Sequence, residues 1–115
     1  MGVQVEIPFY PNSTVIFWQS MMAVNGARGM VQNHVTADPP DVVIAFYEEK
    51  LGAAQRDVVA ESATWHFGDT GGGQHLEVWP ITGAYPFRGA PGSLPPPPDA
   101  KTVIDRSYLC SPEDR

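Results

Sequence analysis

The sequence predicts an α+β domain in which one amphipathic helix packs on one face of an antiparallel sheet of about five strands. Three observations support this class: β-prone runs flank an Asn-Gly dipeptide, a well-delimited helical stretch follows, and alternating segments come after it. The 115 residues suit a single domain, 1–115, with one core, while 12 prolines and 11 glycines indicate long irregular connections.

The first two strands are predicted at "STVIFWQSMMAV" and "ARGMVQNHVTA", after a short leading strand at "VQVEIPF". Asn25 and Gly26 join them in a two-residue turn, because both residues tolerate a positive φ. This turn places Trp18 opposite Asn33. One face of the hairpin then packs on the core, and the other is exposed. The exposed face contains the residues expected to bind a ligand or partner: Phe17, Gln19, Met21, Met30, Gln32 and His34.

The helix is predicted from Pro39 to Leu51. Asp38 is suited to the N-cap position, and Pro39 and Pro40 to the first helical positions, where no amide hydrogen is needed. Gly52 supplies the expected end. A helical period gathers one broad apolar arc, which predicts deep burial of Val42, Val43, Ile44, Phe46, Tyr47 and Leu51.

The second half of the chain predicts a second hairpin and a closing strand. Residues 56–69 and 74–81 read as strands joined by the glycine-rich loop "GDTGGGQ". Residues 82–100 form a proline-rich loop within the domain, and "LPPPPDA" favours a stiff polyproline II crossover. The alternating segment "KTVIDRSYL" is predicted to return to the sheet as its last strand.

Charge and composition exclude several classes of function. The net charge of −6 repels a phosphate backbone or an anionic membrane surface, so nucleic acid is excluded as a partner. No apolar run is long enough to insert into a membrane, and "MGVQVEIPFYP" lacks the pattern of an export signal. We expect a soluble protein, cytoplasmic or, if a signal has been removed, in the cell envelope. The single cysteine, Cys110, cannot form an intrachain disulfide.

Catalytic motifs are absent from the sequence. There is no nucleophile elbow, and "GDTGGGQ" lacks the lysine and the following helix of a phosphate-binding loop, so no catalytic residue and no cofactor are assigned. The histidines His34, His66 and His75 are not spaced as a local ligand pair. A metal-binding subset nevertheless stays open, because His66 and His75 flank the loop and Glu77 shares a strand face with His75.

Two resemblances follow from longer patterns. "FYPNSTV", "TADPPDVVIAFYEEKL" and "KTVIDRSYL" resemble small bacterial envelope domains, many carried by lipoproteins, which have a YPGA turn, a strand ending in T-x-D, a V-x-x-FY helix and closing strands. Asn12 and Ser13 stand where that pattern has glycine and alanine. This resemblance implies the fold, with no activity attached to it.

"NHVTADPPDVVIAFYEEKLG" and "HLEVWP" are similar to the modules of the vicinal-oxygen-chelate (glyoxalase-like) superfamily. This resemblance implies that His34 and Glu77 are ligands of a divalent metal used as a Lewis acid. The superfamily pairs two βαβββ modules to complete a site, and this chain offers one helix, so two chains would have to combine.

The leading functional hypothesis is a non-enzymatic module that binds a small ligand or a protein partner through the exposed face of the first hairpin, with a homodimer as one candidate. The alternative is a dimeric divalent-metal enzyme of the vicinal-oxygen-chelate type. A third hypothesis is a scaffold subunit that uses the proline-rich loop.

Overall fold

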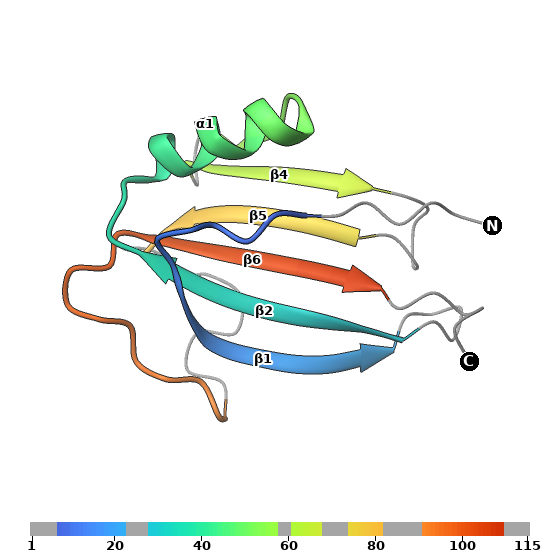
Figure 1. Cartoon of the computed structure of the whole chain (residues 1–115), viewed down its shortest axis with the longest axis vertical. Helices are drawn as coiled ribbons and strands as arrows, with labels where there is room; N and C mark the ends of the chain where they lie inside the picture. The colour runs from blue at the N-terminus through green and yellow to red at the C-terminus, as the bar shows by residue number, and fades with distance from the viewer. Residues whose placement is uncertain (1–6, 23–27, 58–60, 68–73, 82–90, 110–115) are drawn as a thin grey trace.

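The computed structural model describes residues 7–22, 28–57, 61–67, 74–81 and 91–109. A six-stranded antiparallel sheet has the strand order β1-β2-β6-β5-β4-β3, and α1 lies over one of its faces (Figure 1). The elements are β1 Thr14–Met22, β2 Arg28–Thr36, α1 Pro40–Leu51, β3 Gln55–Asp57, β4 Ser62–Phe67, β5 Gln74–Pro80 and β6 Thr102–Leu109. The predicted α+β class is confirmed.

The sheet has one strand more than about five, because the run predicted as one strand at 56–69 contains two. β3 pairs with β4 in an antiparallel ladder, and Glu61, directly before β4, has a positive φ of 54°. Residues 7–9 of the predicted leading strand are not in a strand, and residues 3–6 lie outside the described part of the chain. No helix formed by the described residues is long and apolar enough to cross a membrane.

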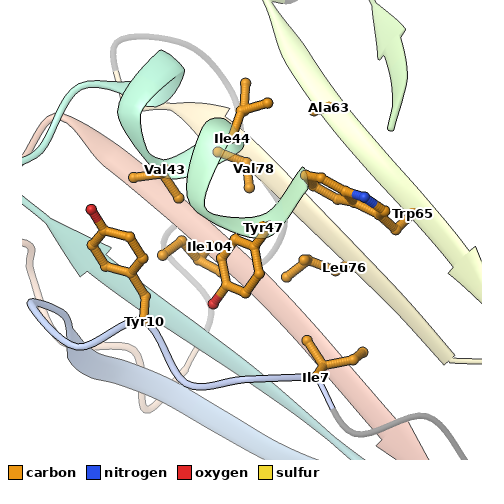
Figure 2. Packing of buried hydrophobic residues seen from close by; sticks show 10 residues of the cluster. All are labelled: Ile7, Tyr10, Val43, Ile44, Tyr47, Ala63, Trp65, Leu76, Val78 and Ile104. Carbon is orange, nitrogen blue, oxygen red and sulfur yellow. The ribbon is translucent and has the colours of Figure 1, made fainter. Parts of the chain in front are cut away.

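The main core lies between α1 and the sheet. Side chains from the helix, from β4, β5 and β6 and from the N-terminal segment converge there (Figure 2), and ten of them form its buried cluster: Ile7, Tyr10, Val43, Ile44, Tyr47, Ala63, Trp65, Leu76, Val78 and Ile104. Hydrogen bonds at its border link the Trp65 Nε1 to the Gly52 carbonyl and the Tyr47 hydroxyl to the Pro8 carbonyl, each at 2.8 Å. The buried arc of the helix is narrower than predicted, since Val42 is 48% exposed.

The helix begins differently from the prediction. Pro39 is the N-cap, with no side-chain cap hydrogen bond, and Asp38 lies one residue outside the helix. A residue before proline prefers an extended backbone, so Pro40 keeps Pro39 out of the helical conformation, and Pro39 rather than Asp38 takes the cap position. The Asp38 carboxylate instead accepts a hydrogen bond from the Tyr10 hydroxyl. The predicted end is confirmed, because Gly52 has a φ of 92° and its amide donates to the Glu48 carbonyl at 3.0 Å.

The register of the first hairpin also differs from the prediction. β1 and β2 do pair antiparallel, but Phe17 lies opposite Asn33 and Trp18 lies opposite Gln32. The one-residue offset from the predicted pairing is already present at Met22 and Arg28, the described pair next to the turn. A second shift, where β1 has one residue more than β2, lies between Val15 and Phe17. Such a β-bulge moves every later side chain to the other face. The predicted turn at 25–26 lies outside the described residues.

The corrected register arranges residues in two rows across the sheet. On the helix side, cross-strand partners form one row of mostly apolar residues: Ala63, Val78, Ile104, His34 and Val15. On the opposite side, called the far face, the adjacent row is mostly polar: Gln55, Thr64, Glu77, Asp105, Asn33 and Phe17. The far face therefore holds a row of polar side chains that runs across the strands of the sheet.

A second, smaller apolar cluster covers one end of the far face. Ile16, Val35 and Val103 are buried there, and Trp79 packs against them. Residues 91–100, the described part of the proline-rich loop, contain no helix or strand, and the Leu94 amide donates to the Ile16 carbonyl at 2.8 Å. This segment therefore lies beside the outer edge of β1.

Candidate functional site

The six predicted hairpin residues do not share one surface. Phe17, Gln19 and Met21 are at far-face positions of β1, whereas Met30, Gln32 and His34 are at helix-side positions of β2. Phe17 and His34 are also buried, with exposures of 6% and 1%. The one-residue offset from the predicted register, present from Met22 and Arg28 onward, separates the two sets of three.

His34 belongs to the helix-side core. Both of its ring nitrogens are buried without a hydrogen-bond partner, and its ring meets that of Phe9 edge-on, with centroids 4.7 Å apart. Burial, and to a lesser extent the Arg106 charge, lowers the pKa of His34 to about 4. Glu77 is on the far face, so His34 and Glu77, which the resemblance implies as metal ligands, lie on opposite sides of the sheet within one chain.

The far face contains a compact cluster of titratable groups, the far-face triad, defined as His75, Glu77 and Asp105. The His75 Nε2 lies 3.2 Å from the Asp105 Oδ2 and 3.9 Å from the Glu77 Oε1. Asp105, on the central strand β6, is 2% exposed, whereas the side chains of His75 and Glu77 are 28% and 24% exposed. The triad thus has one buried end and one accessible end.

Two buried polar residues hold the triad from behind. The Asn33 Nδ2 donates to the Asp105 Oδ1 at 2.9 Å, which leaves the Oδ2 to face His75. The Ser107 Oγ lies 3.0 Å from the His75 Nδ1 and accepts a hydrogen bond from the His75 backbone amide at 2.8 Å. These contacts fix the orientation of both the carboxylate and the imidazole, so that the Nε2 points towards the two carboxylates.

The triad perturbs the charge state of its own members. The Asp105 carboxylate, hydrogen-bonded to the imidazole, raises the pKa of His75. Burial, followed by repulsion from Asp105, raises the pKa of Glu77, while a charged His75 acts in the opposite direction. Two carboxylates that face each other in a half-buried place favour a proton or another cation between them.

A shallow cleft of about 400 Å³ opens beside the triad. Its lining comes from β3, β4 and β5 and consists of Gln55, Arg56, Asp57, Ser62, Thr64, His66, Glu77 and Trp79. Because Glu77 belongs to both the triad and the cleft lining, the accessible end of the triad meets the cleft. The lining combines two carboxylates with hydroxyl, amide and imidazole groups and one indole ring.

Sequence reasoning found part of this site. It placed His75 and Glu77 on one strand face but missed Asp105, Asn33 and Ser107, which are distant in the chain. One signal was available: alternation within "KTVIDRSYL" puts Asp105 and Ser107 on the same strand face. The choice of neighbouring strands, which brings that face beside His75, is not visible in a local pattern.

No protein-family model, curated protein or solved structure gives a significant match to this chain. The resemblances to envelope domains and to the vicinal-oxygen-chelate superfamily therefore stay predictions.

Proposed function

We propose that this protein is a small-ligand-binding module whose binding site is the far-face cleft. The observation that carries the proposal is the meeting of the cleft with the triad at Glu77, a carboxylate whose pKa is raised by burial and by Asp105. Ligand sites are commonly concave regions of a few hundred Å³ with convergent polar groups and perturbed titratable residues.

The lining indicates the chemistry of the ligand. The Asp57 and Glu77 carboxylates belong to the lining, whereas the Arg56 guanidinium lies on the helix side, 3.6 Å from the Glu48 carboxylate. The charges of the cleft therefore do not favour a strong anion. Thr64 and Gln55 add hydrogen-bonding groups, and Trp79 offers an aromatic surface. A small polar molecule that has both donors and acceptors fits this lining.

This proposal places the ligand site on β3, β4 and β5, whereas the sequence predicted it on the first hairpin. The strands provide a rigid floor, because Thr64 pairs with both Gln55 and Glu77 in continuous ladders. The alternative metalloenzyme hypothesis would need ligands from two chains, since His34 and Glu77 face opposite sides of one sheet.

A ligand-observed NMR screen of small polar compounds, including sugars, amino acids and carboxylic acids, tests the proposal. Thr64→Trp places an indole in the cleft and should abolish the saturation transfer seen with the wild-type protein. Gln19→Trp, at an exposed position of β1, adds the same side chain away from the cleft and should leave binding intact. Equal binding by the Thr64→Trp variant, or no binding of any compound, would contradict the proposal.

A further inference from the structure

We infer that His75, Glu77 and Asp105 form a binding site for one divalent transition-metal ion of the Zn²⁺ class. One ligand atom from each residue can be chosen so that all three lie within 4.8 Å of one another. One imidazole nitrogen and two carboxylate oxygens are a common donor set for such ions, whereas Mg²⁺ and Ca²⁺ prefer oxygen alone. The site shares Glu77 with the proposed cleft, but it does not require an organic ligand.

The distances suit a single ion. Ligand bonds of about 2.1 Å in a tetrahedral arrangement place neighbouring donor atoms about 3.4 Å apart. The Nε2 of His75 is 3.2 Å from Asp105 and 3.9 Å from Glu77, so the two separations lie on either side of that value. Glu77, the farther of the two carboxylates from the Nε2, has to move the most.

The residues behind the ligands match what a metal site needs. A metal-binding histidine usually donates its second ring nitrogen to a fixed acceptor, which sets its tautomer. Here the His75 Nδ1 lies 3.0 Å from the Ser107 Oγ, and the Ser107 hydroxyl can donate onward to the His75 carbonyl at 3.2 Å. Asn33 holds the other oxygen of Asp105 in the same way. The Nε2 and the Asp105 Oδ2 are therefore oriented before an ion arrives.

A simple ion pair between His75 and Asp105 accounts for only part of the arrangement. It does not explain why Glu77, a second carboxylate, lies close enough to Asp105 to be repelled by it. Like charges in a half-buried site are unfavourable unless a cation lies between them. A divalent ion would neutralise both carboxylates, and its remaining coordination positions would face the cleft through the accessible end of the triad.

Isothermal titration of chelator-treated protein with ZnCl₂, in the absence of any organic ligand, tests this inference. We expect one ion per chain for the wild-type protein. Glu77→Gln removes a charged ligand at a half-exposed position and should weaken binding at least about 100-fold, and Ser107→Ala should weaken it about 10- to 100-fold. Glu49→Gln is the matched control, because Glu49 is an exposed carboxylate of α1 that lies outside both the triad and the cleft lining.

A second measurement guards against variants that fail to fold. In the wild-type protein, Zn²⁺ should shift the amide NMR signals of His75 and Ser107 more than those of the helix. No heat with Zn²⁺, Co²⁺ or Mn²⁺ would overturn the inference, as would binding that Glu77→Gln leaves unchanged or that Glu49→Gln weakens equally. The titration needs no organic ligand and the cleft screen needs no metal, so failure of one is distinguishable from failure of the other.

Discussion

Replacing His34 with leucine should make the protein more resistant to acid. His34 is 1% exposed, and neither ring nitrogen has a hydrogen-bond partner. A folded-state pKa of about 4, below the ordinary value of 6.5, means that the unfolded chain takes up the proton more readily than the folded one. Stability is therefore lost as the pH falls below about 6.5, and the loss continues down to the folded pKa.

The magnitude follows from the two pKa values. Between pH 7.5 and pH 4.5, one group that titrates at 6.5 unfolded and at about 4 folded removes about 2.5 kcal/mol from the free energy of unfolding. Burial is the larger cause of the shift and Arg106 the smaller, while Asp105 opposes both. At pH 7.5 the leucine variant should be as stable as the wild-type protein or more stable, because two unsatisfied polar atoms are removed.

Urea denaturation of both proteins at pH 7.5, 6.5, 5.5 and 4.5 measures the effect. All other titrating groups are shared, so the difference between the two stability curves isolates His34. The advantage of His34→Leu should grow by about 2.5 kcal/mol across the series. His34→Gln, which is polar but does not titrate, should show the same growth from a lower starting stability. A difference that stays constant with pH would refute the reasoning.

Three further predictions concern the core and the triad, each measured by urea denaturation at pH 7. Val43→Ala should lower the free energy of unfolding by about 2 kcal/mol, because Val43 is fully buried. Val42→Ala should leave it unchanged or raise it slightly, because Val42 is 48% exposed and alanine favours the helix. Equal losses in the two variants would contradict the packing of α1. Asp105→Ala should cost about 3 kcal/mol, since it removes the partner of the buried Asn33 amide and of the His75 imidazole. A loss within 0.5 kcal/mol, roughly that of a surface change, would contradict it. Tyr47→Phe removes the hydrogen bond to the Pro8 carbonyl and should cost about 1 kcal/mol, with no loss expected if that contact is absent in solution.

Local sequence patterns predicted much of the fold. The helix was found to within a residue, because its period, its prolines and its terminal glycine all act over a single turn. The closing strand at 102–109 and the antiparallel pairing of β1 with β2 were likewise predicted. The N-cap was predicted one residue too early, because Pro40 keeps Pro39 extended, and Asp38 contacts Tyr10 instead.

The register and the candidate site depended on tertiary structure. The ladder of β1 and β2 is offset by one residue from the predicted register, and the bulge between Val15 and Phe17 adds a second shift; alternation by itself reveals neither. Likewise, His75 and Asp105 are 30 residues apart and meet only because β5 and β6 are neighbours in the sheet. Periodicity therefore determined which residues share a face of one strand, whereas the order and offset of the strands, set by packing across the whole sheet, decided which of those faces came together.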